Sequence, residues 1–173
     1  EWLERSAENF NQIDPNATGE QQLLNGDFSA YNYDVIEGID YKIDVTKPEG
    51  ERIVNATYKG EPLSADQEFL VVTNDYRAGG GGNFSPCVKE DPVYAPSGVT
   101  NRAQIINYIK AKKTVNPEPT NNWNIKSVEV KGAVTFRSHP EAADYMKKYN
   151  IEGVKFLRKD ENGMGVYKIN INK

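Results

Sequence analysis

A tyrosine and an arginine stand directly before four consecutive glycines near the middle of the chain. The run is Tyr76-Arg77-Ala78-Gly79-Gly80-Gly81-Gly82, with Asn74 just upstream and Asn83 and Phe84 just downstream. Glycine reaches positive φ without strain and has no Cβ to keep a ligand away from the backbone. A ring and a cation beside bare backbone predict a site for a flat or anionic ligand. The alternative is a flexible surface loop whose rings anchor in the core.

The glycine run matches neither of two common nucleotide-binding motifs. A dinucleotide fingerprint would read G-x-G-x-x-G and open a helix in a parallel unit, and a P-loop would continue into Gly-Lys-Ser/Thr. What remains is the ring and the exposed backbone. The face of a tyrosine stacks on a nucleobase with about 1–3 kcal/mol per base in single-strand binders.

Other reactive side chains are scarce. His139 is the only histidine and Cys87 the only cysteine, and they are far apart in the sequence. This excludes a histidine-rich metal site and gives Cys87 no adjacent base, so we expect an inert thiol and a surface histidine. The scattered acids leave an all-carboxylate site open but do not favour one. Of these, Asp40 and Asp44 share a strand face that we expect to be solvent-exposed.

Composition suits a single globular domain. The 173 residues are 38% hydrophobic and 27% charged, with a net charge of −4. This weighs against duplex nucleic acid as a partner, because phosphate binding needs a basic face. No apolar run reaches the length of a membrane span, so we expect no membrane insertion by this chain. The chain opens at Glu1 inside a helical pattern, which indicates a piece of a longer protein.

Hydrophobic periodicity predicts the elements that position the loop. Residues 1–13 read as an amphipathic helix, and one helical turn is expected at 21–24. Residues 31–38 could form a short strand. Clearer strands are predicted at 39–46, 52–58 and 68–74, and their short turns indicate an antiparallel meander.

The second half of the chain adds helices and a hairpin. We expect a helix at 102–113 capped by Asn101, and a strand at 128–136 broken at Gly132. Ser138 is expected to cap a helix that runs to about Tyr149. Residues 154–158 and 166–171 should pair through a turn at 161–163. The class is therefore α+β.

Three segments of this sequence resemble the C-terminal domain of the 5′-nucleotidase family: residues 31–45, 47–53 and 73–81. The subgroup most similar is the bacterial 2′,3′-cyclic-nucleotide 2′-phosphodiesterase/3′-nucleotidases. The features that point there are Glu1-Trp2-Leu3-Glu4-Arg5-Ser6-Ala7, Tyr76-Arg77-Ala78, Asn121-Asn122-Trp123, the helix near Pro140 and Gly165-Val166-Tyr167. The resemblance covers nearly the whole chain.

The resemblance implies one α+β domain over residues 1–173, with mostly antiparallel sheets flanked by helices in the order helix–sheet–sheet–helix. Its role would be substrate recognition within a longer enzyme. An N-terminal metallophosphoesterase domain of the same polypeptide, not contained in this chain, would hold two divalent metal ions. We expect no cofactor, no metal ligand and no catalytic residue here, and an inactive isolated chain. The implied ligands are 2′,3′-cyclic nucleotides and 3′-nucleotides, and the implied location is extracellular, cell wall or periplasm.

The resemblance also implies site residues. Tyr76 would be one of two rings that clamp the base, and the partner ring would lie upstream of Glu1. The substrate-binding candidates are Asn74, Tyr76, Arg77, Gly79, Gly80 and Gly81, with Asn83 and Phe84 as weaker candidates. Of these, Phe84 is expected to pack rather than clamp. An aspartate that contacts ribose in many 5′-nucleotidases would fall near Gly82, where this sequence has no carboxylate. Alternatives are a 5′-nucleotidase or UDP-sugar hydrolase type of substrate domain, or a non-catalytic cell-surface module.

Overall fold

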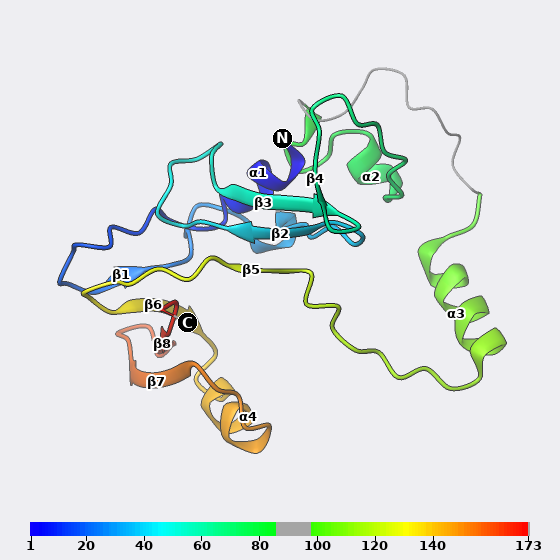
Figure 1. Cartoon of the computed structure of the whole chain (residues 1–173). Coiled ribbons are helices and arrows are strands. Elements are labelled where there is room, and N and C mark those ends of the chain that lie inside the picture. The colour runs from blue at the N-terminus through cyan, green and yellow to red at the C-terminus, as the bar shows by residue number, and fades with distance from the viewer. Residues whose placement is uncertain (86–97, 173) are drawn as a thin grey trace. The chain divides into compact units, whose positions relative to one another are not determined.

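The computed structural model describes residues 1–85 and 98–172, in which two four-stranded sheets and four α-helices form (Figure 1). These confirm the α+β class. The chain separates into two compact units, and each is described by itself. The first unit contains Glu1–Trp2 and Leu63–Asn121, and the second contains Leu3–Pro62 and Asn122–Lys173. Whether residues 1–173 act as one domain stays a prediction.

One sheet of the second unit carries the two strands that the sequence predicts most clearly. Its order is β4 (Glu61–Pro62), β3 (Ile53–Tyr58), β2 (Asp40–Ile43) and β5 (Trp123–Ile125). Strands β2, β3 and β4 are antiparallel neighbours, whereas β5 joins β2 in parallel. The expected meander therefore exists, but its third strand is β4 and not residues 68–74.

The alternation along β2 places its apolar side chains inside. Tyr41, Ile43 and the following Val45 are all buried, whereas Asp40 is exposed. The expectation of a solvent-facing Asp44 is wrong, because its side chain is buried and accepts hydrogen bonds from Lys126 Nζ at 2.7 Å and Thr46 Oγ1 at 2.6 Å. Burial by itself would raise the pKa of Asp44, but these bonds outweigh it and hold the pKa below its ordinary value.

The other sheet contains the predicted C-terminal hairpin. Its order is β1 (Gln21–Gln22), β6 (Val134–Ser138), β8 (Gly165–Ile169) and β7 (Val154–Lys159). The β7–β8 pairing confirms the hairpin. The helical turn expected at 21–24 is wrong, because β1 pairs in parallel with β6. Backbone bonds from a distant strand replace the local helical bonds that the sequence pattern allowed.

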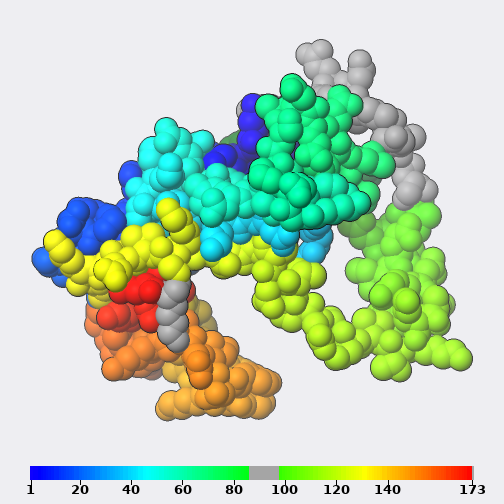
Figure 2. All heavy atoms as spheres, in the orientation of Figure 1, coloured from blue at the N-terminus to red at the C-terminus, as the bar shows by residue number. Residues whose placement is uncertain are grey.

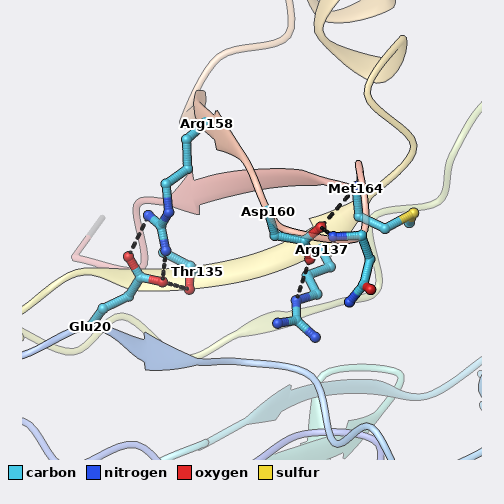
Figure 3. Close-up of polar contacts among 7 residues, drawn as sticks. Glu20, Thr135, Arg137, Arg158, Asp160 and Met164 are labelled. Atoms are coloured by element: carbon cyan, nitrogen blue, oxygen red, sulfur yellow. Dashed lines mark hydrogen bonds and ion pairs between the residues drawn. The ribbon is translucent and has the colours of Figure 1, made fainter.

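Ion pairs on the surface of this sheet connect its strands, as Figure 3 shows. Arg158 donates to both carboxylate oxygens of Glu20 at 2.8 Å, and Thr135 Oγ1 donates to Glu20 at 3.3 Å. The hydrogen bond from Arg158 lowers the pKa of Glu20. A second pair joins Arg137 Nε to Asp160 Oδ2 at 3.1 Å. The first pair links β7 to the segment that leads into β1, and the second links β6 to the residue that follows β7.

Helix α1 (Trp2–Ala7) is shorter than the predicted helix over residues 1–13. The buried guanidinium of Arg52 donates to the carbonyl oxygens of Ala7 at 2.8 Å and Phe10 at 2.7 Å. In return, the Glu4 carboxylate accepts the backbone N–H groups of Arg52 at 3.0 Å and Ile53 at 2.7 Å. The bonds from the Arg52 guanidinium satisfy carbonyl groups at and just beyond the end of α1, which a longer helix would have paired within itself.

The core of the second unit lies between α1 and the two sheets. Its buried hydrophobic side chains come from the N-terminal segment, β2, β6 and the C-terminus: Ala7, Phe10, Ile13, Leu23, Tyr41, Ile43, Val45, Val134 and Ile171. Residues 31–38 do not form the expected strand. A 3₁₀ turn at Ala30–Asn32 includes the first two of them, and Tyr33 and Ile36 after it pack against the core.

Helix α4 (Ala142–Lys148) begins later than expected. The prediction that Ser138 caps it is wrong, because Ser138 is the last residue of β6 and pairs with Gly165. Sheet pairing therefore takes the residue that the local capping pattern assigned to the helix. Glu141 occupies the N-cap position and makes no side-chain capping bond.

The first unit contains α2 (Asp75–Ala78) and α3 (Asn101–Lys112). Thr100 caps α3 by accepting the N–H of Ala103 at 3.2 Å, so the expected Asn101 cap is one residue late. The apolar face expected on α3 is not buried, because Ile105, Ile106 and Ile109 are exposed. The space-filling view shows the open surface of this helix, in yellow-green (Figure 2).

The strand predicted at 68–74 does not form. No strand lies between β4 and α2 in the structure, and Leu70, Val71 and Val72 are exposed. An apolar run supplies the side chains of a strand, but its ladder needs a second segment. None of the described segments pairs with it.

Candidate ligand-binding loop

Helix α2 presents Tyr76 and Arg77 immediately before the glycines. Asn74 is its N-cap, and Asn74 Oδ1 accepts the backbone N–H of Arg77 at 2.8 Å. Asparagine is a preferred N-cap because its side-chain oxygen satisfies an N–H that the first helical turn leaves without a partner. The candidate Asn74 thus has a defined structural role in setting the start of α2.

The glycine run turns back on this helix through its own backbone. Gly80 N–H donates to Arg77 O at 2.9 Å, Gly81 N–H to Tyr76 O at 2.8 Å, and Phe84 N–H to Gly80 O at 3.0 Å. Gly80 has φ +80° and Asn83 has φ +65°. Glycine adopts this left-handed region without strain, and asparagine tolerates it better than most residues. The loop is therefore a hydrogen-bonded turn.

Two of the glycines lie so close to neighbouring atoms that a side chain would not fit. A Cβ on Gly80 would lie 2.8 Å from Ser85 Cα, and a Cβ on Gly81 would lie 2.5 Å from Cε2 and Cζ of Tyr76. Both distances are too short for a real side chain. Gly80 therefore permits the backbone reversal, and Gly81 permits the position of the Tyr76 ring.

The two rings beside the loop differ in exposure. Tyr76 is 63% exposed, whereas Phe84 is fully buried. Phe84 packs on Trp2 with ring centroids 4.8 Å apart and an angle of 34° between the rings. Of these two rings, Tyr76 is thus the one that offers an accessible aromatic surface. The sequence analysis did not single out Trp2 or Ser85, because their proximity to the loop is a contact between positions without a shared local motif.

Arg77 lies inside the loop. Its side chain is 6% exposed, and Nη1 donates to Gly81 O at 2.9 Å. The guanidinium carbon is 4.6 Å from the centroid of the Phe84 ring and 5.5 Å from that of Tyr76. Both are within the range of cation–π attraction.

Among the described residues, the remaining chemical candidates do not gather at a second site. His139 is exposed, with Nδ1 3.9 Å from a carboxylate oxygen of Glu141. Cys87 lies outside the described residues. Within residues 1–85 and 98–172, no three His, Cys, Asp or Glu side chains group so that they could hold a metal ion. None of the helices in that same part of the chain is both long and apolar enough to cross a membrane.

Comparison with known proteins gives consistent matches. A trifunctional nucleotide phosphoesterase protein, YfkN, of Bacillus subtilis is 45% identical over 98% of this chain and 12% of its own length. A 2′,3′-cyclic-nucleotide 2′-phosphodiesterase/3′-nucleotidase of Yersinia enterocolitica is 36% identical over 100% of this chain and 29% of its own length. The chain thus spans less than a third of these relatives.

A solved structure and a family model agree with these relatives. The crystal structure of a protein assigned as a 5′-nucleotidase from Staphylococcus aureus, in complex with alpha-ketoglutarate, has a TM-score of 0.54 and 25% identity. The match covers 77% of this chain and 24% of that one. The model for the 5′-nucleotidase C-terminal domain matches residues 1–90, which include the whole glycine loop. The chain therefore belongs to the 5′-nucleotidase family, in which it corresponds to the C-terminal domain.

Proposed function

We propose that this chain recognises the nucleobase in an enzyme that hydrolyses 2′,3′-cyclic nucleotides and 3′-nucleotides. The observation that carries the proposal is the exposed ring of Tyr76 beside a glycine turn that is held by backbone hydrogen bonds. Family membership supports it, because relatives matching the whole chain are nucleotide phosphoesterases.

The base stacks on the accessible surface of Tyr76. Stacking tolerates different bases because each has a π face, and it contributes about 1–3 kcal/mol per base. Gly79, Gly80 and Gly81 leave the backbone beside the ring without side chains, so a flat ligand approaches it closely. Asn83, which is exposed and follows the glycines at φ +65°, is a candidate for a weaker polar contact.

The chemistry of hydrolysis belongs to another part of the polypeptide in this proposal. An N-terminal metallophosphoesterase domain would hold two divalent ions, and the chemistry that they would supply is the activation of water. The present chain binds and orients the substrate for hydrolysis. A rotation between the two domains carries the bound nucleotide towards the metal-binding domain. The parent enzyme works outside the cytoplasm, in the cell wall, in the periplasm or as a secreted protein.

A 5′-nucleotidase or UDP-sugar hydrolase type of substrate is the alternative within the same family. The solved neighbour is assigned as a 5′-nucleotidase, whereas the relatives at 34–36% identity are named 2′,3′-cyclic-nucleotide 2′-phosphodiesterase/3′-nucleotidases, and we give these more weight because they match the whole chain. The full-length parent protein, assayed with 2′,3′-cyclic AMP, 3′-AMP, 5′-AMP and a UDP-sugar, separates these substrates.

Adenosine titration of this 173-residue chain, followed by NMR, tests base recognition directly. We expect shift changes at residues 74–84 and, for Tyr76→Ala, a loss of affinity of about 5- to 150-fold. Tyr108→Ala is the matched control, because Tyr108 is similarly exposed (55%) but lies on α3. Unchanged spectra at millimolar adenosine, or equal losses in both variants, would favour a non-catalytic surface module.

A further inference from the structure

We propose that Arg77 is a positioning residue that holds the Tyr76 ring in the orientation in which it stacks on the base. This inference rests on the proposed role of Tyr76. From the sequence alone, Arg77 is expected to contact an anionic ligand, because it is a cation directly after the ring. The geometry assigns the guanidinium to the inside of the loop.

Three contacts carry the assignment. Arg77 Nη1 donates to Gly81 O at 2.9 Å, and the guanidinium carbon faces the rings of Phe84 at 4.6 Å and Tyr76 at 5.5 Å. These contacts reach the exposed ring before the glycines, a carbonyl within them and the buried ring after them. Arg77 therefore connects the stacking ring to the parts of the loop that are anchored in the first unit.

The burial of Arg77 distinguishes positioning from ligand contact. Its side chain is 6% exposed, whereas Tyr76 is 63% exposed. A ligand that lies on the accessible surface of Tyr76 reaches the guanidinium only through a rearrangement of the loop. Arg77 thus acts on the ligand through the ring that it contacts.

The chemistry of arginine fits this role. Its guanidinium is planar, so it faces aromatic rings while its N–H groups donate in the plane to a carbonyl. The ammonium of lysine is a compact, strongly hydrated charge that cannot reproduce both contacts. Arg77→Lys should therefore keep the charge but release the ring. Gly81 also contributes to the position of the Tyr76 ring, because the ring occupies the space that a Cβ on Gly81 would fill.

Ordering the ring before binding should increase affinity, because a mobile side chain loses rotamer freedom when the ligand arrives. We expect Arg77→Lys to weaken adenosine binding by about two- to tenfold. A contact with phosphate would make the loss larger for 3′-AMP than for adenosine. A positioning role gives both ligands the same fold-change.

A double-mutant cycle in this chain tests the inference, with adenosine and 3′-AMP titrations of Tyr76→Ala, Arg77→Lys and the double variant. We expect the double variant to bind no more weakly than Tyr76→Ala, because Arg77 acts only through the ring. We also expect the NMR signals of the labelled Tyr76 ring to shift in Arg77→Lys without ligand. The control is Arg5→Lys, since Arg5 lies 5.1 Å from the Phe28 ring in the second unit.

The outcomes separate the two proposals. Three results would overturn the positioning role alone. They are affinity losses that add in the double variant, a larger loss of affinity for 3′-AMP than for adenosine in Arg77→Lys, and wild-type affinity in Arg77→Lys when Tyr76→Ala binds more weakly. Wild-type affinity in Tyr76→Ala would overturn the stacking role and, with it, the role of Arg77. If Arg77→Lys lowers stability, the Tyr76 ring signals and the cycle still decide, because a general loss of structure weakens the double variant further. An equal loss in Arg5→Lys would also count against the inference.

Discussion

The backbone of Gly81 lies against the ring of Tyr76, so closely that a methyl group on Gly81 would be 2.5 Å from two ring carbons. Gly80, one residue earlier, faces the Cα of Ser85 instead. The two neighbouring glycines therefore meet obstacles of different kinds. A methyl group on Gly81 would meet the end of a side chain, which can move, whereas one on Gly80 would meet backbone. Substitution by alanine should therefore have different effects at the two positions.

We predict that Gly81→Ala weakens adenosine binding and leaves stability nearly unchanged. Gly81 has no positive φ, so alanine fits the backbone, and the exposed Tyr76 ring swings aside to admit the methyl group. The change in unfolding free energy should be within about 1 kcal/mol. Adenosine titration and urea unfolding measure the two effects. Wild-type affinity would show that the orientation of the ring does not matter for binding.

We predict that Gly80→Ala destabilises the loop by about 1–3 kcal/mol. Alanine at φ +80° is strained, and its methyl group would meet the Cα of Ser85 at 2.8 Å, which cannot move without moving the chain. Faster hydrogen exchange at the amides of residues 79–85 is the expected readout, with Gly81→Ala as the matched comparison. Equal protection in both variants would contradict the prediction.

We predict that Tyr33→Phe stabilises the second unit by about 1 kcal/mol. The Tyr33 hydroxyl is buried and finds no hydrogen-bond partner among the described residues, while its ring packs edge-on against Phe10 and Trp123. Removing the oxygen therefore removes an uncompensated desolvation cost. Tyr167→Phe is the control with the opposite sign, since the Tyr167 hydroxyl donates to His139 O at 2.8 Å.

The same substitution should change the response to alkali. Burial and, to a smaller extent, Tyr41 raise the pKa of Tyr33 far above its ordinary value. The unfolded chain therefore ionises first, and Tyr33 costs stability as the pH rises above about 10. Urea midpoints measured from pH 8 to 11 should fall less steeply in Tyr33→Phe than in the wild type. Parallel curves would indicate that the hydroxyl is solvated.

We predict that Asp44→Asn destabilises the second unit by about 1–3 kcal/mol at neutral pH. The buried carboxylate accepts from Lys126 and Thr46, and its pKa is lowered. A lowered pKa contributes stability above the ordinary aspartate pKa, and that stability disappears as the pH falls through the lowered value. The gap between wild type and variant should therefore close below about pH 4. The exposed Asp40→Asn is the control, expected to be nearly neutral.

We predict that Gly132→Ala destabilises the second unit by about 1–3 kcal/mol or more. A Cβ at Gly132 would lie 2.1 Å from the carbonyl oxygen of Gly19 and 2.8 Å from that of Ala17. These are backbone atoms of the segment before β1, so that segment and the chain at Gly132 would have to separate. Thermal unfolding compares this variant with Gly26→Ala, where a Cβ meets open space. Equal melting temperatures would contradict the prediction.

Sequence reasoning succeeded where a structural feature depends on neighbouring residues. The alternation around Tyr41 predicted a strand with one buried face, and the turn at 161–163 predicted the β7–β8 hairpin. Capping was less secure, because Thr100 and Asn101 are both good caps, and the structure uses Thr100. Ser138 shows the limit: the local capping signal is genuine, but pairing with Gly165 takes precedence.

At the candidate site, the sequence by itself determined the ingredients: a ring, a cation and a run of residues without Cβ atoms. Only the tertiary structure decided which side chains face outwards. Burial depends on partners that are far apart in sequence, such as Trp2 against Phe84 or Lys126 against Asp44, and no local period encodes them. For that reason, the residues alone indicated Tyr76, Arg77 and Phe84 together, and only the family resemblance set Phe84 apart as a packing ring. The structure exposes Tyr76 and buries the other two.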